Sequence, residues 1–528
     1  MNDEFRYLMA RAARGQLDRR AFLGRAAALG VTSAAATGLL SQAVLAQGPR
    51  QGGSLVMGLV GGESTNSRDP ALAASQVPFA YGYCAGETLL RIDPMGNLVP
   101  KLAEEWTSSA TAQTWRFKIR SGVEFHNGQP LTAEDVAQTL RRHSDENSQS
   151  GALGIMRGIA SISVDGDWLV LETETPNADL PYLLADYHLL IQPNGGFDGA
   201  DSGVMSGPYK WVENEPGVRH VLEKFANHWD PSIGHFNSVE ILVINDSTAR
   251  NSALQSGQVQ MINRIEPRVA GLLGRAPGVS VVSTAGRGHY VFNMRCDAAP
   301  FDNNDLRMAL KLAVNRPDMV DRILRGYGSV GNDMPINASY PLFDDSIEQR
   351  AYDPDQARFH FQRSGHSGPI QLRTSEVAFP GAVDAAQLYQ EHAAACGIEL
   401  EILREPGDGY WSETWNVQPF SASYWGGRPV QDQMYSTAYL SSADWNDTRF
   451  FNDRFDGLLL EARAELDLVR RKTLYSEMGR IVRDEGGLIC PMFNDFIDAH
   501  NASVAGWVTD PNAEMMNGLA GSRCWSAA

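Results

Sequence analysis

The length of this chain constrains its architecture more than any other feature of the sequence. With 528 residues it exceeds what one hydrophobic core usually serves, so we expect two or three packed lobes. A composition of 43% hydrophobic and 20% charged residues, with 50 Gly and 26 Pro, is typical of a globular protein with many turns. The sequence therefore predicts a folded, multi-lobed protein.

Acidic residues dominate the charge of the chain. The formal net charge is -18, and residues 1–46 carry six Arg against two Asp and one Glu, so the rest of the chain carries about -21. A surface of this sign repels nucleic-acid phosphates and anionic lipid headgroups. We therefore expect no nucleic-acid binding.

The N-terminal segment has the features of an export signal. A basic stretch precedes an Ala-, Gly- and Leu-rich run over residues 26–45, and small residues then favour cleavage after Ala46. Thr, Ser and Gln residues interrupt the apolar run, which makes it a poor permanent membrane span. We expect the segment to be removed after export.

The basic stretch also indicates an export route. Arg19, Arg20, Phe22 and Leu23 resemble the twin-arginine motif, although Asp18 and the glycine after Leu23 depart from its usual form. The resemblance implies that the protein folds before the twin-arginine machinery exports it. No cysteine follows the apolar run closely, so we expect a diffusible periplasmic protein rather than a lipoprotein.

Strand and helix patterns alternate irregularly along the remainder. Apolar and polar residues alternate over 114–119, which predicts a half-buried strand, and Thr132 with Asp135 forms the capping pattern of a helix start. The same reasoning predicts strands at 54–60, 168–173, 239–244 and 290–294, and helices at 246–256, 304–314, 317–324 and twice within 454–483. The fold class is α/β with mixed sheets.

The motifs of common catalytic sites are absent from the sequence. The chain has no GxSxG elbow, HExxH helix or GxxxxGK[ST] loop, and no GxGxxG that opens a helix after a strand. The eleven histidines are scattered, and the five cysteines form no CxxC or Cys/His cluster. We therefore expect no catalysis, no metal site and no cofactor.

Several segments in order resemble one family. The longest is SGVEFHNGQPLTAEDV at 121–136, and further segments follow at 206–211, 222–229, 253–258, 292–302, 306–316, 352–357 and 397–400. Together they resemble the family 5 extracellular solute-binding proteins, a group that includes dipeptide, oligopeptide, opine and nickel binders. Gly122, Gly128 and Pro130 suit turns, so most of these residues specify a fold rather than a ligand.

The resemblance implies a two-lobed periplasmic binding protein type II fold with mixed sheets. A third domain is inserted into the first lobe, and the ligand cleft lies between the lobes. On this sequence the export signal is 1–46, lobe I is 47–88, 191–285 and 489–528, the inserted domain is 89–190, and lobe II is 286–488.

One stretch offers candidate ligand-binding residues. Peptide-binding members of the family supply an aspartate from a stretch that corresponds to residues 424–432, and here the aspartate position falls on Arg428 or on Asp432. Arg428 would bind a carboxylate, whereas Asp432 would bind an amine. An ion pair is the plain structural alternative for Arg428. The other candidates for the ligand-binding site are Tyr424, Trp425, Gly426 and, as a second carboxylate partner, Arg449.

The resemblance also implies a function. We expect the monomeric periplasmic solute-binding subunit of an ABC importer, which captures a peptide or opine-like solute and delivers it to the permease subunits. Two other classes stay open: a ligand-loaded sensory or chaperone-type binding protein, and a secreted hydrolase with a noncontiguous triad.

Overall fold

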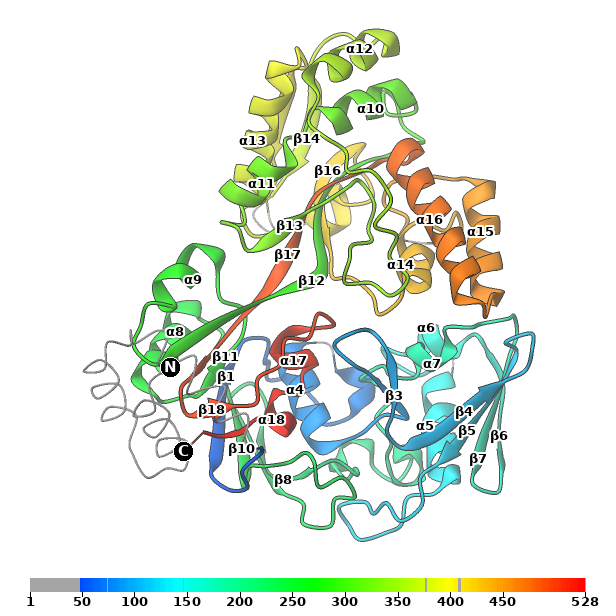
Figure 1. Cartoon of the computed structure of the whole chain (residues 1–528), viewed down its shortest axis with the longest axis vertical. Coiled ribbons are helices and arrows are strands. Elements are labelled where there is room, and N and C mark those ends of the chain that lie inside the picture. The colour runs from blue at the N-terminus through cyan, green and yellow to red at the C-terminus, as the bar shows by residue number, and fades with distance from the viewer. Residues whose placement is uncertain are drawn as a thin grey trace, which may run out of the picture.

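The structure is a computed structural model that describes residues 48–73, 75–145, 147–375, 378–406, 410–443 and 445–527 (Figure 1). The predicted twin-arginine motif at Arg19, Arg20, Phe22 and Leu23 and the cleavage site at Ala46 lie outside these residues. Within the described ranges, no helix combines the length and apolar character needed to cross a membrane.

One large mixed sheet runs through the molecule. Its eleven strands have the order β15-β14-β16-β12-β17-β11-β1-β10-β9-β8, with β13 paired to β17 outside this path. Their bounds are β1 (Ser54–Leu59), β8 (Tyr209–Glu215), β9 (Arg219–Lys224), β10 (Ser238–Val243), β11 (Met261–Ile262), β12 (Val279–Met294), β13 (Gly328–Val330), β14 (Ile370–Thr374), β15 (Leu400–Arg404), β16 (Phe420–Trp425) and β17 (Leu488–Asn501). The predicted α/β class is confirmed.

Two long strands in the middle of this sheet connect its two ends. β12 and β17 pair antiparallel from Val279 opposite Asn501 to Asn293 opposite Leu488, and the register shifts between Ala285 and His289 and again between Tyr290 and Phe292. Figure 1 shows both strands running from the lower left to the top of the molecule. The sequence predicted only residues 290–294 of β12, because glycines and polar residues hide the earlier part, which pairing with β17 holds extended.

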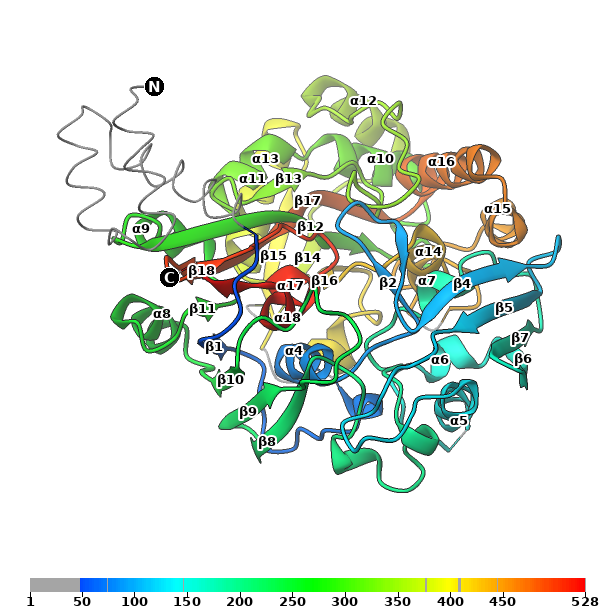
Figure 2. The same ribbon diagram turned by 60° about the horizontal axis from the view of Figure 1, so that its bottom comes forward.

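The elements on one side of these strands form lobe I. They are β1, β8–β11, α4 (Gln76–Ala85), α8 (Ser247–Ser256), α9 (Pro267–Leu273), α17 (Glu514–Asn517), α18 (Ala520–Arg523) and the small pair β18 (Val504–Ala505) and β19 (Trp525–Ser526). Figure 2 shows α4, α17 and α18 close to β1 and β10. Two hydrophobic clusters fill this lobe, one of which contains the buried side chains of Met515 and Met516.

The chain between α4 and β8 forms a separate unit with its own core. A four-stranded antiparallel sheet has the order β4-β5-β7-β6 and packs against α5. The bounds are β2 (Leu90–Ile92), β3 (Leu98–Pro100), β4 (Ala103–Ser108), β5 (Thr114–Ile119), α5 (Ala133–Ser144), α6 (Leu153–Met156), β6 (Ile159–Asp165), β7 (Trp168–Thr173) and α7 (Leu180–Leu183). The predicted helix start is confirmed, because Thr132 and Asp135 form a complete capping box.

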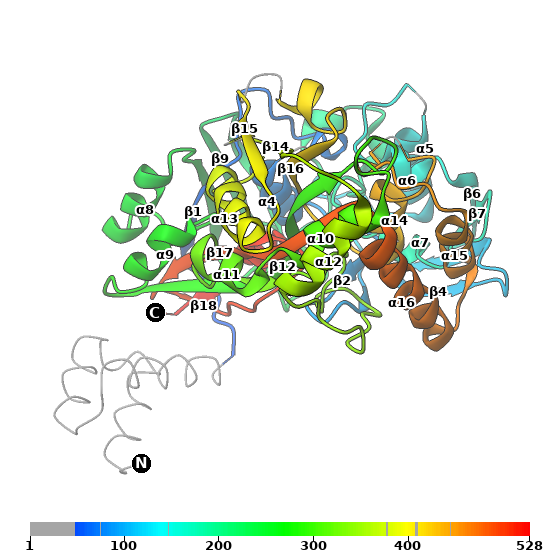
Figure 3. The same cartoon turned by 90° about the horizontal axis from the view of Figure 1, so that it is seen from above.

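Lobe II lies at the other end of the long strands. It contains β13–β16 and the helices α10 (Asn304–Leu312), α11 (Arg316–Arg322), α12 (Pro354–Ser364), α13 (Ala382–Ala395), α14 (Gln431–Ala438), α15 (Asp453–Ala464) and α16 (Leu468–Glu485). Figure 3 shows α10–α13 gathered on one side and α14–α16 on the other. Each group has its own hydrophobic cluster, and both clusters include residues of β17.

Candidate ligand-binding cleft

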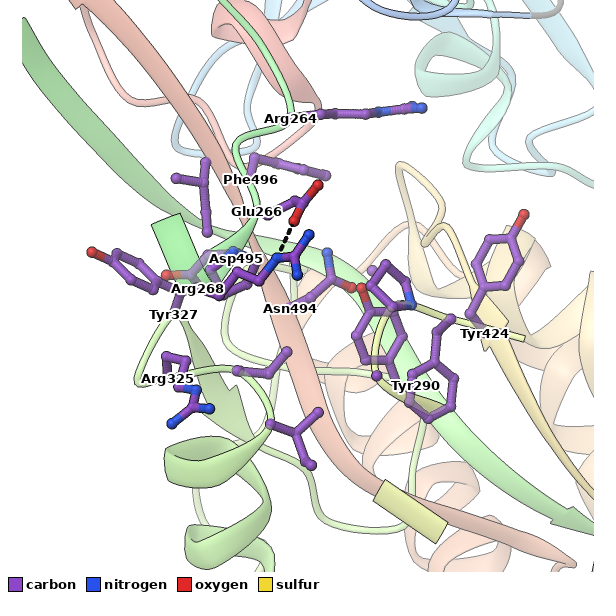
Figure 4. A pocket seen from close by; sticks show the side chains of 18 of the residues that line it. Arg264, Glu266, Arg268, Tyr290, Arg325, Tyr327, Tyr424, Asn494, Asp495 and Phe496 are labelled. Atoms are coloured by element: carbon purple, nitrogen blue, oxygen red, sulfur yellow. Dashed lines mark hydrogen bonds and ion pairs between the residues drawn. The ribbon is translucent and has the colours of Figure 1, made fainter. Parts of the chain in front are cut away.

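A cleft of about 820 Å³ lies where the two lobes meet along β12 and β17. Lobe I contributes Arg264, Arg268 and Glu514, β12 contributes Tyr290, and lobe II contributes Phe379 and Tyr424. Figure 4 shows Arg264 and Tyr424 on the same side of the long strands, with a gap between their side chains. The volume of the cleft is that of a site for a small ligand, because such sites usually span about 300–1,000 Å³.

Aromatic side chains form the lobe II wall of the cleft. The rings of Tyr290 and Phe379 stack in parallel, with centroids 4.4 Å apart and planes inclined by 6°. Tyr424 stands at the end of β16 with 50% of its surface exposed. This wall offers apolar faces to a ligand, and the tyrosines add polar edges.

An ion pair forms part of the lobe I wall. Arg264 Nε donates to Glu514 Oε1 at 2.6 Å, and Asn263 Nδ2 donates to Glu514 Oε2 at 3.1 Å. The Arg264 side chain is 55% exposed, whereas that of Glu514 is only 12% exposed. The charge of Glu514 raises the pKa of Arg264 above its usual value, so the guanidinium stays cationic.

A buried arginine of α8, Arg250, holds the backbone at Arg264 by hydrogen bonds to carbonyl oxygens. Arg250 donates from Nε to the carbonyl oxygen of Asn263 at 3.0 Å and from Nη2 to that of Arg264 at 3.1 Å. Its Nη1 donates to the carbonyl oxygen of Ile244 at 2.8 Å. Arg264 itself has a left-handed backbone, with φ 48°, which non-glycine residues rarely adopt.

The backbone that directly follows Glu514 is left-handed as well. Met515, Met516 and Asn517 follow one another with φ of 53°, 59° and 57°. A left-handed turn costs L-residues roughly 1–2 kcal/mol each, so the surrounding structure must impose it. Both methionines are buried, and the Met515 N–H donates to Asp498 Oδ2 of β17 at 2.7 Å. Burial, followed by the nearby charge of Glu514, raises the pKa of Asp498 to about 8.

Trp425 of the predicted site donates a hydrogen bond to the buried carboxyl group of Asp447. Asp447 Oδ2 accepts three hydrogen bonds, from Trp425 Nε1 at 3.2 Å, Trp415 Nε1 at 2.8 Å and Asn293 Nδ2 at 2.7 Å. Burial raises the pKa of Asp447 to about 7. Trp425 lines the cleft, but most of its ring packs in the core of lobe II.

Arg428 does not line this cleft, and it lies near Asp186 and Tyr187 of the unit that carries α7. Its guanidinium sits 5.8 Å from the ring centroid of Trp425, and its Nη1 donates to the Gly427 carbonyl oxygen at 2.7 Å. No carboxylate in the described part of the chain forms an ion pair with it. Burial lowers the pKa of Arg428, although Tyr187 and Asp186 act in the opposite sense.

Asp432 is already occupied by a cation of lobe II. Its Oδ1 accepts from Arg463 Nε at 3.0 Å, and the carboxyl is buried at the start of α14. Nearby, Asp179 forms a buried ion pair with Arg471, and the Ala178 N–H donates to the Arg463 carbonyl oxygen at 2.8 Å. These contacts join lobe II to the unit that carries α7.

The remaining predicted residues lie in different settings. Tyr424 and Gly426 line the cleft, and a side chain on Gly426 would meet nothing within 4 Å. Gly427 has φ 77° and approaches the backbone of Arg287, not a ligand. Arg449 has φ 46° and does not line the cleft.

Sequence reasoning missed Arg264 and Glu514. They are 250 residues apart in the chain, so no local pattern joins them. The one available signal is that Asn263 and Arg264 directly follow the short buried strand β11, because polar residues at strand ends often line sites.

Among the described His, Cys, Asp and Glu residues, no group of three or more could hold a metal ion. The cleft instead combines a fixed ion pair, an aromatic wall and two long connecting strands. Such an arrangement can enclose a small polar solute and shield its polar contacts from water.

Comparisons with known proteins agree with this architecture. The family model of the bacterial extracellular solute-binding proteins, family 5 Middle, matches residues 97–447. The glutathione-binding protein GsiB of Shigella flexneri is 23% identical over 470 residues, which cover 85% of this chain and 91% of GsiB. Two solved structures are similar at the level of the fold.

The first is the periplasmic binding protein DppA of Helicobacter pylori in complex with the peptide STSA, with a TM-score of 0.73, 20% identity, and coverage of 91% of this chain and 99% of DppA. The second is AgaA of A. tumefaciens R10 in complex with agropinic acid, with a TM-score of 0.73, 21% identity, and coverage of 90% and 99%. The fold is that of the two-lobed type II periplasmic binding proteins. Since the family model matches more than half of the chain, this protein belongs to the bacterial extracellular solute-binding proteins, family 5.

Proposed function

We propose that this protein is the periplasmic solute-binding subunit of an ABC importer. The observation that carries the proposal is the cleft of about 820 Å³ that both lobes line beside β12 and β17. A ligand held there would be enclosed when the lobes close, and a permease could bind the closed form in preference to the open form. Export by the twin-arginine route, with removal of residues 1–46, would bring the folded protein to the periplasm.

The division of the chain into lobes belongs to the same proposal. Lobe I at 47–88, 191–285 and 489–528 and lobe II at 286–488 would rotate against each other about β12 and β17. The first residues of 489–528, up to Phe493, pack in the cores of lobe II, so the change of lobe falls within β17. The inserted domain at 89–190 would move with lobe I. The contact of Asp179 with Arg471 joins this domain to lobe II, which supports a role in the closed form.

Peptides and opine-like conjugates are the proposed ligand class. GsiB binds glutathione, and the two structural neighbours hold a peptide and agropinic acid. Of the two candidate charges on residues 424–432, Arg428 is the better anchor, because Asp432 is neutralised by Arg463 while Arg428 has no carboxylate partner among the described residues. Since Arg428 does not line the cleft, it would bind a part of the ligand that extends beyond the cleft. A ligand carboxylate at Arg428 would complete its hydrogen bonds.

A thermal-shift screen of the protein from Gln47 onward tests the proposal. The compounds are di- and tripeptides, glutathione, opine-type conjugates, sugars and nickel. A ligand at about a hundred times its Kd adds about 2.7 kcal/mol of stability, which raises the Tm measurably. We expect carboxylate-bearing compounds to raise the Tm and Arg428→Ala to reduce that shift. If no compound shifts the Tm, the proposed ligand class is wrong.

Transport and sensing are separated by deletion of the gene. Loss of uptake of the ligand identified in the screen supports import. Intact uptake with loss of a ligand response would instead support the sensory alternative. Turnover of that ligand by the purified protein would indicate a hydrolase.

A further inference from the structure

Arg264 combines exposure with an unusually fixed position. Its side chain is 55% exposed and lines the cleft. In Figure 4 it extends away from the backbone of its own loop toward the side of the cleft where Tyr424 lies. Exposed arginines usually move among many rotamers, so a fixed one is informative.

The ion pair with Glu514 uses only one edge of the guanidinium. Nε donates to Glu514, while Nη1 and Nη2 make no hydrogen bond to any residue that the structure describes. These two nitrogens form the outer edge of a planar fork, which matches the two oxygens of a carboxylate. The pair thus orients Arg264 and leaves its outer edge available.

Three separate devices hold this arrangement. Arg250 donates hydrogen bonds to the backbone carbonyl oxygens of Asn263 and Arg264. Asn263 binds the second oxygen of Glu514. The left-handed turn after Glu514 is tied to Asp498 of β17. Strained backbone on both sides of one ion pair is typical of a ligand-binding site rather than of a surface contact.

We infer that Arg264 binds an anionic group of the solute, and that Glu514 is the positioning residue that aims it. The inference rests on the proposed function and deepens it: the solute carries a carboxylate or an anion of similar shape at the lobe I wall. Its remaining part packs against the stacked rings of Tyr290 and Phe379 across the cleft.

The test measures how strongly the protein distinguishes charge on one ligand. Isothermal titration calorimetry compares a carboxylate compound that binds in the screen, such as a tripeptide, with the same compound as its carboxamide. Arg264→Gln removes the cation at an exposed side chain, so the variant should fold. Arg268→Gln is the matched control, because Arg268 lines the same cleft but is 76% exposed and paired with Glu266.

The wild type and Arg268→Gln should prefer the carboxylate by about 10- to 100-fold, which is the range for one charge-assisted contact. In Arg264→Gln this preference should fall to about twofold or less. If the preference for the carboxylate persists in Arg264→Gln, another residue binds the charged group and the inference is wrong. Loss of the preference in Arg428→Gln alone would assign it to Arg428.

Glu514→Gln tests the positioning role separately. This change keeps the shape of the side chain and an oxygen that can accept from Arg264 Nε. It removes the negative charge and the second oxygen, which accepts from Asn263 Nδ2. We expect the carboxylate preference to fall by about three- to tenfold while carboxamide binding is unchanged. A purely structural role would weaken both compounds equally and would overturn the assignment.

The two proposals fail in different ways. If no compound in the screen binds, the proposed function falls and the inference falls with it. If a compound binds but Arg264→Gln leaves its charge preference intact, the binding function stands and only the inference is lost.

Discussion

At the scale of single residues, Asp447 links the core of lobe II to the cleft. Three N–H donors meet at its Oδ2, and its Oδ1 is buried without a hydrogen-bond partner among the described residues. Burial opposes ionisation of this carboxyl, whereas the donors and the charge of Arg449 favour it. Since the pKa is raised to about 7, the neutral acid is the form that suits the folded protein.

Asp447→Asn should therefore flatten the dependence of stability on pH. In the unfolded chain this carboxyl has a pKa of about 3.9, so its stabilising contribution is complete below about pH 4 and is lost as the pH rises to 7. Asparagine stays neutral, keeps an oxygen for the three donors and places an amide at Oδ1. We expect equal stability at pH 5 and a gain of about 1–3 kcal/mol at pH 8.5.

Chemical denaturation of both proteins at the two pH values measures this difference. Asp498 titrates in the same range, but it is present in both proteins and cancels in the comparison. A loss of stability of equal size at both pH values would show that the ionised carboxylate is required.

At the level of residues, the sequence placed candidates beside the cleft only where the signal was local. Tyr424, Trp425 and Gly426 line the cleft because they lie at the end of the buried strand β16, and their role in ligand binding stays a prediction. Arg264 and Glu514 could not be predicted, since their roles depend on backbone conformations and on a contact between distant segments.

At the scale of elements, the connection between β16 and α14 shows two adjacent glycines with different roles. A Cβ on Gly427 would lie 2.5 Å from Arg287 Cβ and 2.9 Å from its carbonyl carbon, and the backbone has φ 77°. A Cβ on Gly426 would meet nothing within 4 Å. Only Gly427 fixes the path of the loop toward Arg428.

Gly427→Ala should accordingly destabilise the protein by about 2 kcal/mol or more, through both steric overlap and the left-handed backbone. Gly426→Ala is the matched control and should stay within about 0.5 kcal/mol of the wild type. Thermal unfolding compares the two variants. Equal Tm values would mean that the loop moves to accept the side chain and is not held by β12.

Most elements could be predicted because their signals lie within a few residues. The alternation at 114–119 and the cap at Thr132 are both confirmed, as are the two helices within 454–483. The first half of β12 could not be predicted, because its extended form comes from pairing with β17, about 200 residues later in the chain.

At the scale of the whole molecule, a buried clasp holds lobe II against the unit that carries α7. Asp179 is 3% exposed and Arg471 5% exposed, and Tyr475 OH also donates to Asp179. Such a pair is costly to break on one side only, by about 3–5 kcal/mol, because a buried charge is then left alone. The clasp therefore favours the position of lobe II against this unit that the structure shows.

Asp179→Asn should shift the protein toward an open form. Small-angle scattering without ligand should give a larger radius of gyration, and ligand affinity should fall because closure then costs more. Asp165→Asn is the control, since its ion pair with Arg116 is exposed and lies within one unit. An unchanged radius of gyration in Asp179→Asn would show that the clasp does not set the lobe arrangement.

The shared strand β17 also determines the order in which the hydrophobic cores of the two lobes can be completed during synthesis on the ribosome. Ile489, Met492 and Phe493 belong to the cores of lobe II, whereas Ile497 and Ala499 of the same strand belong to lobe I. Lobe II therefore has its last core residue once Phe493 has been synthesised and has left the ribosome. Lobe I, whose first strand is β1, still lacks the core residue Met515 at that stage. We expect a nascent chain paused between these two points to contain all core residues of lobe II but only part of those of lobe I, so that the cleft between the lobes is still incomplete.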